Sequence, residues 1–166
     1  MPTNAIIRFL ENYIPVSEEE KSLIQAPFEE LVLKRRQKLL RSGEVCKAYT
    51  FVVSGCFRMY GVDDRGFEHN IQFVAENDWI ADMASFYTGK ASLLNIEALE
   101  ASRVLQIGQA DLYRLYEEVP KLNRIFKVMI EHKYIELQNR VLQNFSSTAE
   151  ILCLRSRRNK DFLKFR

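Results

Sequence analysis

The hydrophobic and polar positions change their spacing twice along the chain, from helical to strand-like and back to helical. The first helical part holds the stretch SEEEKSLIQA. There, Ser17 and Glu20 have the spacing of a capping box, and three glutamates lie at the positive end of a helix. This pattern predicts a helix over residues 17–26. We also expect a shorter helix over residues 5–13.

Residues 31–107 read as short strands separated by turn signals at fairly regular intervals. The strand-like runs are ELVLK, AYTFVVS, CFRMYGV, FEHNIQFV, LNIEALE and SRVLQIG, and the breaks are SGE, SG, DDRG and YTGK. The break DDRG predicts a hairpin turn, because Asp and Gly tolerate a positive φ. Strands at this spacing predict a mainly β fold with flanking helices, arranged as a small sandwich or barrel.

A long helix is predicted after the strands, and we assign residues 120–148 to it because Pro120 suits the first helical turn. One apolar stripe is Leu122, Phe126, Ile130, Tyr134, Leu137, Val141 and Phe145, and a second is Ile125, Val128, Met129, Ile135 and Leu142. A helix that covers a sheet needs one apolar face, so the second stripe predicts packing against the same helix of a second chain. The alternative is a helix enclosed within its own domain. The residues assigned to the dimer helix are Leu122, Ile125, Phe126, Met129, Leu137 and Val141.

The composition is that of an ordinary globular domain. The 166 residues are 47% hydrophobic and 28% charged, which suffices for one domain with a real core. The apolar runs are too short to cross a bilayer, and the start MPTNAIIRFLENY does not have the pattern of a secretory signal. We therefore expect a cytoplasmic protein with no membrane partner.

Candidate chemistry for catalysis or metal binding is scarce. Cys46, Cys56 and Cys153 are odd in number and widely spaced, and His69 and His132 form no metal-ligand motif. No nucleophile with a base, paired catalytic carboxylates or Gly-rich nucleotide loop can be assembled. We expect no metal, no cofactor and no enzymatic activity.

Positive charge is concentrated at the end of the chain. Residues 149–166 carry a net charge of +4, whereas residues 1–148 carry −2. Only this basic tail has the concentration of positive charge that we expect of a segment that binds nucleic acid.

The order of elements and two stretches, SGEVCKAYTFVVSGCFRMY and IADMASFYTGKASLLNIEALEAS, resemble the sensor half of the CRP/FNR family of bacterial transcription regulators. In its general residue pattern the sequence is similar to family members from Bacteroidetes-type bacteria, many of which lack the nucleotide-binding residues. The resemblance implies a double-stranded β-helix, a jelly-roll or cupin-like β-roll. It implies a sensor domain over residues 1–119 and a dimerisation helix over residues 120–148.

The resemblance also implies a cassette for a cyclic nucleotide, in which glycine and glutamate hold the ribose while arginine and serine hold the phosphate. Aligned outward from Ala98, these four positions are Ala81, Asp82, Ser92 and Leu93. A buried phosphate without a charge-assisted partner loses on the order of 3 kcal/mol, roughly a hundredfold in affinity. We therefore expect a degenerate pocket that does not bind cAMP.

The candidate ligand-pocket residues are Arg58, Ala81, Asp82, Met83, Ala84, Lys90, Ser92 and Leu93. Asp82 needs a partner if it is partly buried, and Arg58, Lys90 or backbone amides are the candidates. Three interpretations of the loop stay open. It is only a packing element, it binds a less anionic small-molecule effector, or Lys90 replaces the missing cation.

The resemblance weakens after Glu150, where AEILCLRSRRNKDFLKFR loses the helical pattern. Family members continue into a winged helix-turn-helix that reads DNA. We expect this chain to lack that domain through truncation or frameshift. DNA binding would then require the missing domain. The leading hypothesis is a sensor and dimerisation domain of a CRP/FNR-like regulator. The alternative is a free-standing small-molecule binding module that regulates a protein partner.

Overall fold

The computed structural model describes residues 3–144, and the chain divides into two compact units. The first unit ends at Leu122 and the second begins at Asn123. The predicted helical residues 145–148 and the basic tail, residues 149–166, lie outside the described part. Among the helices that the structure describes, none combines the length and the apolar content needed to cross a membrane.

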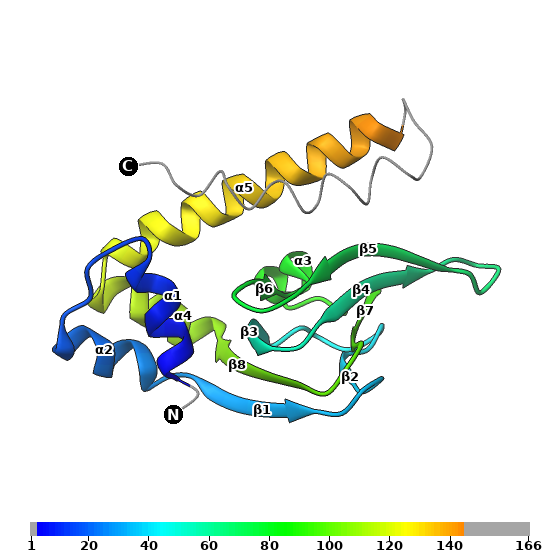
Figure 1. Cartoon of the computed structure of the whole chain (residues 1–166). Coiled ribbons are helices and arrows are strands. Elements are labelled where there is room, and N and C mark those ends of the chain that lie inside the picture. The colour runs from blue at the N-terminus through cyan, green and yellow to red at the C-terminus, as the bar shows by residue number, and fades with distance from the viewer. Residues whose placement is uncertain (1–2, 145–166) are drawn as a thin grey trace. The chain divides into compact units, whose positions relative to one another are not determined.

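Two four-stranded antiparallel sheets form the body of the first unit (Figure 1). The first sheet has the order β1 (Glu29–Leu33), β8 (Ser102–Gly108), β3 (Ala48–Ser54) and β6 (Trp79–Ile80). The second sheet has the order β2 (Lys38–Leu40), β7 (Leu94–Ala98), β4 (Phe57–Val62) and β5 (Glu68–Val74). This jelly-roll-like architecture confirms the predicted mainly β fold.

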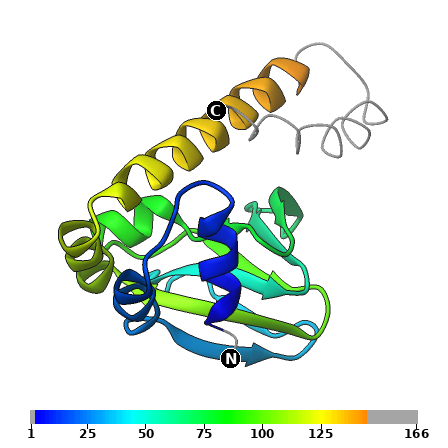
Figure 2. The same cartoon turned by 60° about the vertical axis from the view of Figure 1, so that its left-hand side comes forward.

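Four of the described helices flank the sheets of the first unit: α1 (Asn4–Glu11), α2 (Glu18–Gln25), α3 (Met83–Thr88) and α4 (Gln109–Glu118). The long helix α5 (Lys121–Asn144) follows α4 in the chain and continues into the second unit. Figures 1 and 2 show α1, α2 and α4 gathered at one end of the roll, with α1 crossing in front of the strands in the turned view. Both predicted N-terminal helices are thereby confirmed.

The start of α2 has the predicted capping box. The Ser17 amide donates to Glu20 Oε2 at 2.8 Å, and the Glu20 amide donates to Ser17 Oγ at 3.3 Å. Glu20 Oε2 also accepts a hydrogen bond from Lys121 Nζ at 2.6 Å, and this contact lowers the pKa of Glu20 below its ordinary value. The cap therefore ties α2 to the start of α5 as well as stabilising its own first turn.

Aromatic side chains fill the centre of the first unit. Trp79 and Phe51 are fully buried, with ring centroids 5.2 Å apart. Tyr49 packs against Trp79 at 4.7 Å, and Phe9 of α1 packs against Phe51 at 5.3 Å. Burial of apolar surface is the dominant favourable term in folding, and aromatic rings bury large areas of it, so this cluster fixes α1 on the first sheet.

The break DDRG forms the predicted hairpin between β4 and β5. The Gly66 amide donates to the Asp63 carbonyl at 2.9 Å, and Gly66 has a φ of 86°. Asp63 Oδ1 accepts the amides of Arg65 and Phe67, and His69 Nε2 lies 2.9 Å from Asp63 Oδ2. The His69 contact is the main cause of the lowered pKa of Asp63.

Four elements were not predicted. Strands β2 and β6 have three and two residues, which is too short to show a period. The segment assigned to a loop contains α3, and the stretch QADLYRLYEE forms α4. The helical region therefore begins before Pro120, and Val119 leaves helical geometry between α4 and α5.

Gly55 and Gly66 allow a matched test of close packing. Both have positive φ, but a Cβ on Gly55 would lie 2.9 Å from Ser102 Cα, whereas a Cβ on Gly66 would meet nothing within 4 Å. We expect Gly66→Ala to lower the free energy of unfolding by about 1 kcal/mol through backbone strain alone. Gly55→Ala adds overpacking and should cost about 2–4 kcal/mol in total. Urea unfolding measures both, and equal losses would contradict the close approach of Gly55 to β8.

Candidate functional site

The cassette predicted from the sequence is built around the short helix α3. Asp82 is the N-cap of α3, and its Oδ1 accepts the amides of Ala84 at 3.1 Å and Ser85 at 3.3 Å. Its Oδ2 accepts a hydrogen bond from Ser92 Oγ at 2.6 Å. Asp82 and Ser92 are both buried, so this bond lies away from water. The carboxylate is thus satisfied by the helix start and by one hydroxyl.

Ser92 is fixed in place by its backbone as well as by its side chain. It is only 2% exposed, and its Oγ also accepts the Leu94 amide at 2.9 Å. The Ser92 amide donates to the Glu44 carbonyl at 2.8 Å, and the Gly43 amide donates to the Ser92 carbonyl at 2.7 Å. The loop between β2 and β3 therefore holds Ser92 against Asp82.

Ser85 is a cassette residue that the sequence analysis missed. Its Oγ donates to the Lys90 carbonyl at 2.6 Å and accepts the Cys46 amide at 2.9 Å. It therefore joins α3 both to the loop that follows α3 and to the loop that precedes β3. Burial raises the pKa of the adjacent Cys46 thiol, which disfavours the reactive thiolate. The signal that could have indicated this role is a serine three residues after a capping aspartate.

The remaining cassette candidates face different environments. Ala81 is buried, Met83 is half-buried and Ala84 is exposed. Lys90 is exposed, and Leu93, at the position of the family's phosphate-binding serine, is 83% exposed. Of the candidate partners for Asp82, the structure supplies backbone amides and, in addition, Ser92.

Arg58 forms its ion pairs with other residues and is not the partner of Asp82, whereas its place in a ligand pocket stays a prediction. Its guanidinium pairs with Glu97 at 2.9 Å and with Glu68 at 2.7 Å, and it lies 4.2 Å from the centroid of the Tyr60 ring. Glu97 raises the pKa of Arg58, so its charge is held by carboxylates already present. Along β4, Arg58 is flanked by the buried Phe57 and Met59, so it lies on the opposite face of the sheet from them.

A second polar group sits beside this ion pair. Lys38 Nζ donates to Asn95 Oδ1 at 3.1 Å, and the Ser42 amide donates to the same oxygen at 3.3 Å. Lys38 also lies 5.7 Å from the Tyr60 ring centroid. Sequence patterns could not reveal this group, because its members come from different strands and the loop after β2.

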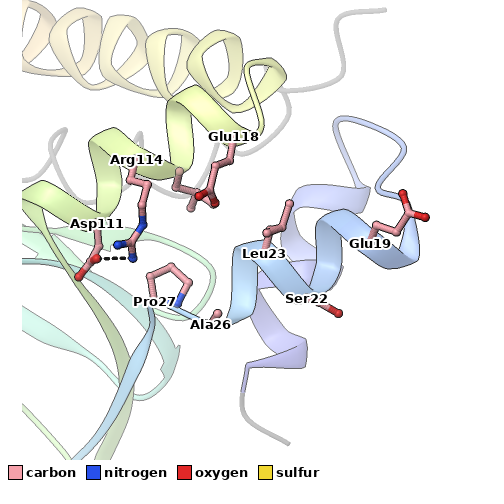
Figure 3. Close-up of a pocket in the computed structure, with 9 residues that line it drawn as sticks. Glu19, Ser22, Leu23, Ala26, Pro27, Asp111, Arg114 and Glu118 are labelled. Carbon is pink, nitrogen blue, oxygen red and sulfur yellow. Dashed lines mark hydrogen bonds and ion pairs between the residues drawn. The ribbon is translucent and has the colours of Figure 1, made fainter.

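A groove of about 620 Å³ runs between α2 and α4 (Figure 3). It is lined by Glu19, Ser22, Leu23, Ala26, Pro27, Asp111, Arg114, Leu115 and Glu118. Its one lining cation, Arg114, is paired with Asp111 at 2.6 Å, as the dashed line in Figure 3 marks. The two glutamates leave the lining acidic, so the groove does not suit an anionic ligand.

The residues predicted for the dimer helix fall into two groups along α5. Leu122, Ile125 and Phe126 are buried, and Met129 is half-buried. Leu137 and Val141 are 49% and 47% exposed. The exposed large apolar residues of α5 are Val128, Ile130, Tyr134, Ile135, Leu137, Val141 and Leu142. They include members of both predicted stripes. The buried apolar residues therefore lie near the start of α5 and the exposed ones further along it, rather than on two opposite faces.

Comparisons with known proteins fit this geometry. The family model described as "Cyclic nucleotide-binding domain" matches residues 30–119. No curated protein sequence matches the chain.

Several solved structures share the fold. A cyclic nucleotide-binding domain from Methylobacillus flagellatus is 17% identical with a TM-score of 0.72, over 89% of this chain and 86% of its own. The sensor domain of the transcriptional regulator DNR from Pseudomonas aeruginosa is 17% identical with a TM-score of 0.64, over 85% of this chain and 94% of its own. The catabolite activator protein of Thermus thermophilus is 16% identical with a TM-score of 0.66, over 85% of this chain; the match spans 62% of the Thermus protein.

Removing the hydroxyl of Ser92 tests whether its bond to Asp82 holds the cassette together. Ser92→Ala leaves one buried carboxylate oxygen without its donor, so we expect the free energy of unfolding to fall by about 1–3 kcal/mol. Ser42→Ala is the matched control, because Ser42 is exposed, and it should change stability by less than about 0.5 kcal/mol. Denaturant unfolding measures both. Equal stability of Ser92→Ala and the native chain would contradict the buried bond.

Proposed function

The chain belongs to the cyclic nucleotide-binding domain family, and from that premise we propose that it is the sensor and dimerisation module of a CRP/FNR-like transcription regulator, with a degenerate nucleotide cassette. Family membership rests on the match over residues 30–119, which is more than half of the 166 residues. In this proposal the chain acts by binding and pairing rather than by catalysis.

The observation that carries the degenerate cassette is the 2.6 Å hydrogen bond between Ser92 and Asp82. In the family's pattern the position of Ser92 belongs to the arginine that pairs with the phosphate. Here it holds a buried hydroxyl that donates to a carboxylate. A cyclic phosphate placed beside this pair would face a negative group with no guanidinium to offset it, which is unfavourable in a site shielded from water.

Neither remaining cation of the predicted set offers a ready substitute. Arg58 is paired with Glu97 and Glu68, and separating a half-buried guanidinium from its two carboxylates costs free energy. Lys90 is exposed, and ordering its flexible side chain against a ligand costs conformational entropy. A small effector without a phosphate charge suits the cassette better. Its hydroxyl or amine groups would pair with Asp82 once Ser92 is displaced.

Exposed apolar residues on α5 support pairing with a second copy. Between Val128 and Leu142 the helix exposes seven large apolar side chains. A concentration of exposed apolar side chains on one helix is typical of a surface that packs against a partner. The same helix of another chain offers a matching apolar surface in a two-fold arrangement. An effector bound at the cassette would then act by favouring one arrangement of the paired helices.

The alternative function is a free-standing small-molecule binding module that regulates a protein partner. The family match over residues 30–119 supports this alternative equally well, since it covers the roll and ends before α5 begins. A chain that stays monomeric and still binds a small effector would favour it.

Calorimetric titration with cAMP tests the cassette. We expect the native chain to give no binding at micromolar concentrations, because the phosphate lacks its cation. The double variant Ser92→Arg with Leu93→Ser restores the family's pair and should gain roughly a hundredfold in affinity if it folds. A variant that restores only Leu93→Ser is the control and should gain little. Micromolar binding by the native chain would refute the degenerate cassette.

Light scattering tests the pairing of α5. The native chain should have about twice the monomer mass of 19.5 kDa at micromolar concentration. Leu137→Glu and Val141→Glu place a charge among the exposed apolar residues and should shift the population to monomer. Asn139→Glu adds the same charge at an exposed polar position and should leave the dimer intact. A folded native chain that is strictly monomeric contradicts this part of the proposal.

A further inference from the structure

The turn between β1 and β2 carries three consecutive cations, Lys34, Arg35 and Arg36, named here the basic turn. All three are exposed. Among the residues that the structure describes, none of the three is in an ion pair. Their charges are therefore available to a partner outside the chain, unlike that of Arg58.

Backbone contacts hold the basic turn rigidly on the second sheet. The Arg36 amide donates to the Ala98 carbonyl at 2.7 Å, and the Ala98 amide donates to the Gln37 carbonyl at 2.9 Å. The Gln37 amide donates to the Lys34 carbonyl at 3.0 Å, and the Lys34 amide donates to Gln37 Oε1 at 2.9 Å. A partner would thus meet a preformed array of cations rather than a loop that must first be ordered.

Arg36 occupies a position that does not favour an arginine for backbone reasons. Its φ is 65°, in the left-handed region that glycine and asparagine adopt more readily. A glycine there would relieve the strain and keep the hydrogen bond from the residue 36 amide to the Ala98 carbonyl. The guanidinium at this position is therefore better explained by a contact of its side chain than by the stability of the turn.

Other charged side chains lie on the strands and loops beside the basic turn. Arg41 is exposed on the loop after β2, whereas Arg103 is tied to Glu30 at 3.1 Å. The exposed acids Glu76 and Glu100 both lie near Cys56, whose carbonyl accepts the Leu99 amide next to Ala98. Among the ion pairs of the described residues, neither acid is paired with the basic turn. Figure 1 shows this turn at the end of the roll away from α1, α2 and α4. The groove between α2 and α4, whose lining is acidic, lies at the opposite end of the first unit from the basic turn (Figure 1).

We propose that the basic turn is a contact site for the phosphate backbone of duplex DNA. Three adjacent cations on a projecting turn form a ridge, which suits a linear array of phosphates better than one enclosed anion. That the polyanion is DNA rests on the proposed regulator function. That the turn has unpaired positive charge is an observation independent of that function. The turn contributes affinity that depends on salt and little on base sequence.

Fluorescence anisotropy with a labelled duplex of mixed sequence tests the site in the full chain. We expect binding in the range of about 10⁻⁴ to 10⁻⁶ M near physiological salt. The triple variant Lys34→Gln, Arg35→Gln and Arg36→Gln should reduce the slope of log affinity against log salt by about 2–3, since each phosphate contact contributes about 0.9. Binding should weaken at least tenfold at low salt.

Two further variants separate the site from net charge and from folding. Arg8→Gln, Lys47→Gln and Arg124→Gln together remove the same charge at other exposed positions and should leave the slope nearly unchanged. The Arg36→Gly variant should unfold at the same temperature as the native chain or a higher one. Its slope of log affinity against log salt should still decrease by about 0.9, the value for one phosphate contact.

Four outcomes overturn the proposal. They are no binding of the duplex, an unchanged slope in the triple variant, an equal loss in the charge control, and binding to anionic phospholipid vesicles but not to the duplex. An unchanged slope would place the binding elsewhere, for example on the basic tail. Because the cAMP titration and the light scattering do not depend on the basic turn, failure here leaves the proposed function standing.

Discussion

The buried hydrogen bond from Ser92 to Asp82 determines what the cassette can hold. The side chain of Asp82 caps the start of α3, and because this carboxylate is buried it needs further hydrogen-bond donors. Ser92 supplies one at 2.6 Å, while the loop at Gly43 and Glu44 fixes the Ser92 backbone. The same atoms that stabilise α3 therefore make the site unfavourable for a second anion. In the proposed function, stability of the cassette and weak phosphate binding both follow from this one contact.

Much of the fold could be predicted because its signals are local. The capping box at Ser17 and the hairpin at residues 63–66 depend on residues within a few positions of each other, and both are confirmed. The alternating strands are likewise found, because a sheet with one buried face imposes a period of two. In contrast, α3 was assigned to a loop. A six-residue helix between a capping aspartate and a glycine shows too few turns for a helical period.

The site was less predictable, because its contacts join distant parts of the chain. The pair of Asp82 with Ser92 spans ten positions, and the pairs of Arg58 with Glu97 and Ser85 with Cys46 each span 39. Spacing along the sequence aligned Ser92 with the family's arginine. It did not indicate that Ser92 would become the partner of Asp82, or that Arg58 would be held by two glutamates. Only the fold brings these side chains together.

A crystal structure grown with saturating cAMP tests the central claim most directly. The Ser92–Asp82 contact should remain at hydrogen-bonding distance, with no nucleotide density beside α3. A cyclic nucleotide seated there, with its phosphate at Ser92 and its charge met by Lys90 or another cation, would contradict the claim.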